Sequence, residues 1–324
     1  MKTKKLIWRQ YYWTIPATML LALLAGSGFT ESEDPTTPAV TMRAAPEPVA
    51  QPVNFGPVIN TKLRQAEPSF TADGKTMYFN CQVRPDRAGN DICVSNLIGT
   101  LEDGKWTTPE VVAPGVISLK ETFDAEPLIS SDGKKLFFVS TNRPGGYGET
   151  DIWYSENVDG VWQSPKNLGP PFNTPFSDHC LMFTAEGNEA FWTSTRPGGF
   201  GGNDIWTSRK VDGVWQLATN LGQNVNSPNS DHHSLPSPDG KSLYVTSARP
   251  GGFGGEDIYI TTRDETGAWG PMVNLGALVN TNKDDRCPSL TPDLRIFMFD
   301  SERAGGYGDK DLWWVYYDTV RYVR

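Results

Sequence analysis

The chain has 324 residues, with 29 Lys and Arg against 38 Asp and Glu, which gives a formal net charge of −9. This acidic balance argues against nucleic acid or an anionic membrane surface as a partner. The 25 prolines and 32 glycines favour many short strands and turns over long helices. A single large all-β domain fits this length.

The first segment has the pattern of a secretory signal peptide. Residues 1–27 begin with four basic side chains, continue with an apolar stretch over roughly 13–24, and end in small residues. The stretch is shorter than the ~20 residues that cross a bilayer, so we expect cleavage after Ser27 and a periplasmic or secreted protein. An uncleaved signal anchor is the alternative. Cleavage removes the four basic residues and no acidic ones, which changes the net charge from −9 to −13.

The next segment, residues 28–52, is rich in Pro, Thr, Ala and acidic residues and has no periodic apolar pattern. Such a composition is typical of a disordered linker. The folded part is therefore expected over 53–324.

Within the folded part, one glycine-rich phrase returns several times. It reads "RPGGFGGNDIW" at 196–206, and its other copies lie at 143–153, 249–259 and 303–313, with a worn version at 84–93. The arginines that open the five copies are separated by 59, 53, 53 and 54 residues. A period of this size indicates a solenoid, a propeller or an array of repeated units.

Each repeat contains four strand-like runs separated by turn signals. In the copy that starts at Asp231 these runs lie at 232–237, 241–248, 257–263 and 268–276, with an Asp-Gly hairpin turn after the first. Four-stranded antiparallel sheets repeated around an axis are the blades of a β-propeller. We therefore predict an all-β, five-bladed propeller that is a monomer.

The ends of the chain supply a check on closure. The fifth copy lacks the fourth run, but residues 51–61, "QPVNFGPVINT", match residues 270–281, "GPMVNLGALVNT", nearly position for position. The N-terminal strand is therefore expected to complete the last blade and to close the ring.

Three segments carry a resemblance to a known family. They are "EPSFTADGKTMYF", "EPLISSDGKKLFF" and "SLPSPDGKSLYV", each followed by the glycine phrase, and they resemble the WD-like propeller repeats of the TolB type. The resemblance implies a binding or scaffolding module of the bacterial cell envelope, with an envelope protein or a glycan as its ligand. It identifies the fold better than the function.

The glycine phrase itself is expected to be structural. It would connect the second and third strands of each blade, with its glycines at positive φ and its aspartate bonded to loop amides. Calcium binding by these aspartates and backbone carbonyls is the alternative. Cys81 and Cys93 flank the worn copy, and a register centred near residue 87 would place them opposite one another, so we expect a disulfide if the chain is exported.

The start of the innermost strand of each blade should line the mouth of the central channel. Counting seven residues back from each hairpin turn gives one residue per blade, and we call these five positions the axial ring: Glu67, Glu126, Cys180, His233 and Cys287. One residue earlier lie His179, His232 and Arg286, and two residues earlier lie Asp124, Asp178, Asp231 and Asp285. Because strand side chains alternate with period two, these aspartates are expected to face the channel with the axial ring, and all these polar side chains are candidates for ligand binding.

Two chemical hypotheses follow from the axial ring, beside the simple one that its side chains pack the channel mouth. In the first, Cys180, His233 and Cys287 hold a metal, with Glu67, Glu126 or His179 completing the shell; zinc suits these ligands best, and copper stays open. In the second, the chain is a glycoside hydrolase, since such enzymes use paired carboxylates. The candidates are Glu67, Glu126 and Asp124. The binding module remains the main expectation and the hydrolase the alternative.

Overall fold

The computed structural model describes residues 51–82 and 90–321. The expected signal peptide at 1–27 and nearly all of the linker at 28–52 lie outside this range, as do residues 83–89 of the worn phrase. Strands dominate the described residues, and the helical structure among them is a single 3-10 turn, η1 (Tyr317–Thr319). No helix among these described residues is long and apolar enough to cross a membrane.

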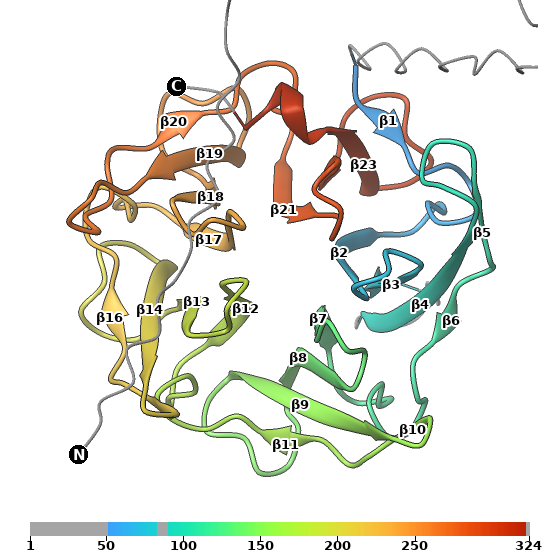
Figure 1. Ribbon diagram of the computed structural model, residues 1–324, viewed down its shortest axis with the longest axis horizontal. Coiled ribbons are helices and arrows are strands. Elements are labelled where there is room, and N and C mark those ends of the chain that lie inside the picture. The colour runs from blue at the N-terminus through green and yellow to red at the C-terminus, as the bar shows by residue number, and fades with distance from the viewer. Residues whose placement is uncertain (1–50, 83–89, 322–324) are drawn as a thin grey trace, which may run out of the picture. The chain divides into compact units, whose positions relative to one another are not determined.

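Five antiparallel sheets surround a central axis, as Figure 1 shows. The first strand of each sheet lies nearest the axis. In chain order these inner strands are β2 (Gln65–Phe70), β7 (Asp124–Ile129), β12 (Asp178–Phe183), β17 (Asp231–Pro236) and β21 (Asp285–Leu290). The five-bladed propeller predicted from the repeat is therefore confirmed.

The second and third strands lie outside the inner strands and have six to nine residues each. The second strands are β3 (Thr76–Cys81), β8 (Lys135–Thr141), β13 (Glu189–Ser194), β18 (Ser242–Ser247) and β22 (Ile296–Ser301). The third strands are β4 (Asp91–Ile98), β9 (Thr150–Val158), β14 (Asp204–Val211), β19 (Asp257–Thr262) and β23 (Asp311–Tyr316).

The outermost strands are much shorter than the sequence pattern suggests. They are two-residue segments, namely β6 (Glu110–Val111), β11 (Lys166–Asn167), β16 (Thr219–Asn220), β20 (Val273–Asn274) and β1 (Val53–Asn54). In β20 the cause is visible, because the side chain of Asn274 accepts the N–H of Gly276 at 2.8 Å and turns the chain away from the sheet. Three blades carry a further short strand: β5 (Lys105–Trp106), β10 (Val161–Trp162) and β15 (Val214–Trp215).

The N-terminal strand closes the ring as expected. β1 pairs antiparallel with β23 in the last blade, with Val53 opposite Trp314. The Phe55 N–H donates to the carbonyl of Leu312 at 3.1 Å, and the side-chain amide of Asn60 donates to the same carbonyl at 2.9 Å. The first described strand is thus held by the end of the chain.

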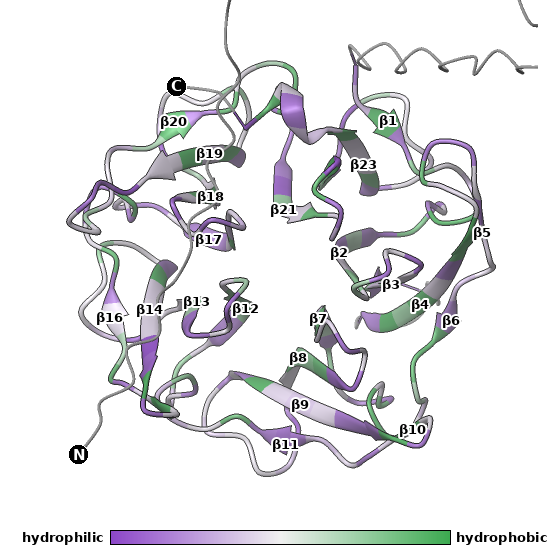
Figure 2. Ribbon diagram, viewed as in Figure 1, coloured by the Kyte–Doolittle hydropathy of each residue, from purple (hydrophilic) through white to green (hydrophobic). Residues whose placement is uncertain are grey.

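The hydrophobic core lies between adjacent blades. One position in each second strand is buried and apolar in all five copies: Phe79, Phe138, Trp192, Val245 and Phe299. Each hydrophobic cluster mixes residues of neighbouring blades, as when Trp192 packs with Ile152 of the preceding blade. Figure 2 shows hydrophobic positions alternating with more polar ones along the strands, as expected for sheets that pack face to face. No blade can bury its apolar faces without its neighbours.

The glycine phrase fastens each blade to the next one. In the third blade Asp204 accepts the backbone N–H of Phe200 at 3.0 Å, and Gly198 has a φ of 97°. A Cβ atom on Gly201 would lie 1.9 Å from the carbonyl oxygen of Asn229, which belongs to the loop that enters the fourth blade. The donors around Asp204 are N–H groups, which a calcium site would exclude. The phrase therefore has the structural role expected for it.

Candidate functional site

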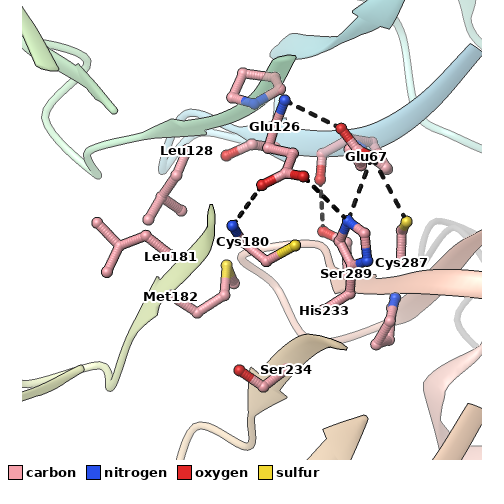
Figure 3. A pocket seen from close by; sticks show the side chains of 14 residues that line it. Glu67, Glu126, Leu128, Cys180, Leu181, Met182, His233, Ser234, Cys287 and Ser289 are labelled. Atoms are coloured by element: carbon pink, nitrogen blue, oxygen red, sulfur yellow. Dashed lines mark hydrogen bonds and ion pairs between the residues drawn. The ribbon is translucent and has the colours of Figure 1, made fainter. Parts of the chain in front are cut away.

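The axial ring lines a cavity of about 60 Å³ on the propeller axis. Figure 3 shows the side chains of Glu67, Glu126, Cys180, His233 and Cys287 directed toward one another, with Leu128, Leu181 and Met182 forming an apolar wall. Counting back from the hairpin turns thus brought together five residues that are far apart in the chain. The cavity has room for a water molecule or an ion and is much smaller than the roughly 300–1,000 Å³ of a typical ligand pocket.

The backbone of the axial ring is unusual. All five residues have positive φ, between 47° for His233 and 58° for Glu67. Each one sits where the pairing between the first and second strands shifts register, as between Ala125 and Leu128, which marks a β-bulge. A non-glycine residue in this conformation costs on the order of 1–3 kcal/mol, and such strain clusters at functional sites. The fold imposes it five times around one cavity.

Glu67 uses its two carboxylate oxygens differently. Oε2 accepts the side-chain amide of Asn80 at 2.6 Å and the backbone N–H of Glu126, in the next blade, at 3.0 Å. Oε1 lies 3.3 Å from Nε2 of His233 and accepts the thiol of Cys287 at 3.8 Å. One oxygen therefore fastens two blades together, and the other faces the axis.

Glu126 repeats this arrangement one blade further on. Its Oε2 accepts the backbone N–H of Cys180, while Oε1 lies 3.4 Å from Nδ1 of His179 and 3.7 Å from Nε2 of His233. Burial acts to raise the pKa of Glu126, but the two histidines outweigh it and lower the pKa to about 2. Burial also acts to lower the pKa of His179, and Glu126 reverses this and raises it. The lowered pKa of Glu126 and the raised pKa of His179 both favour an ionised carboxylate beside an imidazolium.

A second group of charges surrounds the fourth blade. Nδ1 of His232 bonds to Nδ1 of His233, and its Nε2 lies 2.8 Å from Oε1 of Glu256. Arg286 donates to Oε2 of Glu256 at 2.7 Å and to Glu302 at 3.0 Å. Burial acts to raise the pKa of Glu256, but His232 and Arg286 outweigh it and lower the pKa to about 2. Arg286 and His232 thus bind protein carboxylates beside the site.

The expected metal set of Cys180, His233 and Cys287 is not a single cluster. Ligand atoms within 4.8 Å of one another form three sets among the described residues: Glu67, His233 and Cys287; Cys180, His232 and His233; Glu126, His179 and Cys180. The two cysteines therefore lie in different sets, because their blades are separated by the blade of His233. Burial and the nearby carboxylates raise the pKa of both thiols well above the ordinary value.

The four aspartates expected at the channel mouth belong to the scaffold instead. Asp124 was predicted as a catalytic candidate and the other three as ligand-binding groups, and these predictions are wrong. Each aspartate is fully buried and pairs with the arginine that opens the glycine phrase of its blade: Asp124 with Arg143, Asp178 with Arg196, Asp231 with Arg249 and Asp285 with Arg303, at 2.7–2.9 Å. Period-two alternation fails here because the bulge at the axial ring lies between the aspartate and the rest of the strand.

Several polar residues near the axis were missed in the sequence. One position, directly before the aspartate of the glycine phrase, is Asn90, Thr150, Asn203, Glu256 and Lys310 in the five blades. Asn203 lies 3.3 Å from Nε2 of His179, and Lys310 lies 3.1 Å from the buried Asp300. The sequence does mark this position, because its residue varies among the blades while the aspartate that follows it in the glycine phrase is the same in all five.

The structure joins Cys81 and Cys93 in a disulfide, with Cα atoms 5.8 Å apart. The register differs from the expected one, because Cys81 faces Asp91 and Cys93 faces Phe79 across the strands. The two cysteines are therefore diagonal neighbours rather than direct partners.

Comparison with known proteins supports the architecture. No family model matches the chain, and no curated protein matches it in sequence. Among solved structures, the catalytic domain of the Coprinopsis cinerea GH62 α-L-arabinofuranosidase gives a TM-score of 0.51 at 12% identity, over 82% of this chain and 96% of that one. An α-L-arabinofuranosidase from Podospora anserina gives 0.50 at 14% identity, over 83% and 94%. The Bacillus subtilis arabinanase gives 0.50 at 11% identity, over 82% and 97%.

These similarities establish the fold alone, since the identities are low. They nevertheless overturn the identification with TolB-type WD-like repeats, because the similar solved propellers are glycoside hydrolases and no repeat-family model matches. The inference of an envelope binding module, which rested on that resemblance, loses its support with it.

Proposed function

We propose that this propeller is an exported hydrolase that acts on a carbohydrate, with its reacting centre at the axial ring. The observation that carries the proposal is the pair of glutamates facing the axis. Because Nε2 of His233 lies 3.3 Å from Oε1 of Glu67 and 3.7 Å from Oε1 of Glu126, the two oxygens are at most about 7 Å apart. This upper limit falls inside the range of roughly 5–9.5 Å over which glycosidases hold their two carboxyl groups.

The chemistry assigns the groups as follows. Glu126 is ionised, so it takes the proton of an attacking water. The water oxygen forms a bond to the anomeric carbon while the bond to the leaving oxygen breaks, and His179, next to Glu126, returns a proton to that oxygen. The carboxylate of Glu67 stabilises the positive charge that develops on the sugar.

Two features outside the centre support the proposal. The five-bladed hydrolases named above have the same architecture, and two of them are named as α-L-arabinofuranosidases and one as an arabinanase. The Cys81–Cys93 disulfide suits an oxidising compartment, where an extracellular glycan would be met. The cavity of about 60 Å³ requires the sugar to lie above the axial ring, at the mouth of the channel, rather than inside it.

A glycan panel tests the proposal. The purified chain is incubated with arabinan, arabinoxylan and β-1,3-galactan, and released sugars are measured by ion chromatography. Turnover is expected on at least one of them, and Glu126→Gln should lower kcat at least about 100-fold, the range for loss of a general base. Glu186→Gln, at an exposed hairpin turn, is the matched control and should leave kcat unchanged. Binding of a glycan with no turnover, or full activity of Glu126→Gln, refutes the proposal.

A further inference from the structure

Three potential ligand atoms converge on the axis from three consecutive blades. Oε1 of Glu67 comes from the first blade, Nε2 of His233 from the fourth and Sγ of Cys287 from the fifth, which β1 joins to the first. The oxygen lies 3.3 Å from the nitrogen and 3.8 Å from the sulfur, and all three atoms lie within 4.8 Å of one another. A tetrahedral zinc site with bonds of about 2.0–2.3 Å sets its ligand atoms roughly 3.3–3.8 Å apart.

The remaining polar atoms of these side chains are already held in place. Oε2 of Glu67 accepts hydrogen bonds from Asn80 and from the backbone of Glu126, and Nδ1 of His233 bonds to His232. Partners on the far side of a ligand fix its orientation and are typical of metal sites. Oε1 of Glu67 therefore lies on the side of the carboxylate that faces His233 and Cys287, and Figure 3 shows these three side chains directed toward one another.

The electrostatics of the cavity favour a cation. Among the described residues that line it, two are glutamates and none is lysine or arginine. Nε2 of His233 is buried and forms no hydrogen bond, although it lies between the two carboxylates. A metal ion bound between these atoms would coordinate the nitrogen and would neutralise part of the carboxylate charge.

We propose that Glu67, His233 and Cys287 bind a divalent transition metal, with zinc as the ion that suits a set of one carboxylate, one imidazole and one thiolate. Three protein ligands leave a fourth position open, as in catalytic zinc sites. Oε1 of Glu126, 3.7 Å from Nε2 of His233, lies beside that position. The ligand set differs from the one expected from the sequence, because Glu67 takes the place of Cys180.

The two other sets of nearby ligand atoms are satisfied without a metal. In the set of Cys180, His232 and His233, the two imidazoles bond directly to each other through their Nδ1 atoms. In the set of Glu126, His179 and Cys180, Nδ1 of His179 lies 3.0 Å from Sγ of Cys180 and 3.4 Å from the carboxylate. Each of these sets has a contact shorter than those that Glu67 makes in the chosen set, at 3.3 Å with His233 and 3.8 Å with Cys287, which leaves more room there for an ion between the ligand atoms.

The inference concerns the same cluster as the proposed hydrolase and adds a metal to it, with Glu67 as a ligand and Glu126 as the group that acts on water. The two proposals fail in different ways. Bound zinc without sugar release leaves the metal site standing and removes the hydrolase. Sugar release by a zinc-free chain that chelators do not affect leaves the hydrolase standing and removes the metal.

The first experiment uses the wild-type chain, exported and purified without a metal-affinity tag. Elemental analysis should find about one equivalent of zinc per chain. Because the cavity is buried, the chain is also refolded from denaturant with Co²⁺ under disulfide-preserving conditions. A thiolate-to-cobalt charge-transfer band is expected, since Cys287 is a ligand. Less than a tenth of an equivalent of zinc together with no such band overturns the proposal.

The second experiment compares two cysteines at equivalent positions of the axial ring. Cys287→Ser should remove the charge-transfer band and weaken zinc binding more than about 100-fold, since losing even a partner of a ligand costs about 10–100-fold. Cys180→Ser is the matched control, buried and with the same φ of 55°. It should keep the band and weaken binding less than about tenfold. Equal losses in the two variants, with near-UV circular dichroism showing both folded, refute the assigned ligand set.

Discussion

Replacing Asp178 by Asn tests whether the buried aspartates belong to the scaffold or to a ligand site. In the structure Oδ1 accepts Arg196 at 2.7 Å, and Oδ2 accepts the backbone N–H and the hydroxyl of Thr174, each at 2.6 Å. An asparagine keeps the shape but turns one acceptor into a donor. Whichever way it is oriented, its NH₂ group faces another donor, and the charge of Arg196 loses its partner.

The expected cost follows from burial. The Asp178 side chain is fully buried and that of Arg196 is 10% exposed, so solvent screens the pair little. Breaking a buried ion pair on one side costs about 3–5 kcal/mol. Arg196 keeps its bonds to the carbonyls of Pro171 and Phe172, which places the expected loss near the lower end, about 3 kcal/mol. At about 2–4 °C per kcal/mol, the melting temperature should fall by roughly 6–12 °C.

Denaturant unfolding followed by tryptophan fluorescence, together with thermal melts, measures the effect. Asp212→Asn is the matched control, because it makes the same chemical change at an exposed position of the same blade and should stay within about 0.5 kcal/mol of wild type. Arg196→Met should cost less in the Asp178→Asn background than alone, since the two residues share one interaction. If Asp178→Asn lowers the free energy of unfolding by less than about 1 kcal/mol and also weakens ligand binding, Asp178 is a ligand-binding residue rather than part of the scaffold.

Three further predictions concern closure, the disulfide and pH. Deleting residues 51–61 should lower the melting temperature of the whole ring, because the deletion exposes the edge of β23. Deleting only residues 28–50 should not lower it, and equal melting temperatures of the two truncated chains would contradict the prediction. Reducing the Cys81–Cys93 disulfide should lower the free energy of unfolding by about 2–4 kcal/mol, given the 12-residue separation, and identical denaturation curves with and without reductant would refute it. In the metal-free chain, the free energy of unfolding of the wild type should exceed that of Glu126→Gln by about 3 kcal/mol above pH 4.5, because the pKa of Glu126 in the folded chain is about 2 and its ordinary value is 4.5. This difference should vanish as pH falls toward 2. The stabilisation that protonated His179 gives to the folded chain is complete below pH 6.5 and is lost as pH rises through its raised pKa. A stability difference that does not vary with pH would count against the ion pair of Glu126 and His179.

The blade number and the closure could be predicted because they depend on repetition alone. The period of the glycine phrase counts the blades, and the match of 51–61 to 270–281 identifies the strand that the last blade lacks. The axial ring could be predicted for the same reason: equivalent positions of a repeat lie at equal distances from the axis. Glu67, at the start of the first repeat, and Cys287, in the last, therefore meet although 220 residues separate them.

The direction of the neighbouring side chains could not be predicted, because it depends on a bulge that leaves no mark in the sequence. Left-handed residues are usually glycine, but here Glu, Cys and His occupy these positions. The alternation that placed Asp178 beside Cys180 fails at that bulge. The register around Cys81 differs from the expected one by two residues, since Cys81 faces Asp91 rather than Cys93. A shift of two residues keeps both side chains on the same face of the sheet, so the disulfide still forms between diagonal neighbours.

The bulge also explains how one ring can carry both structure and chemistry. In two inner strands the backbone N–H at the bulge donates to a side chain of the preceding blade: the N–H of Glu126 donates to Glu67, and the N–H of Cys180 donates to Glu126. In the fifth blade the N–H of Cys287 donates instead to Thr246 at 3.1 Å, which frees His233 from this task. A residue of the axial ring can therefore be something other than glutamate where a different side chain accepts the backbone N–H of the next blade. The imidazole of His233, which does not accept this N–H, has its Nε2 atom 3.3 Å from Glu67 and 3.7 Å from Glu126 instead, so the ring position freed from this scaffold bond is the one that lies between the two carboxylates.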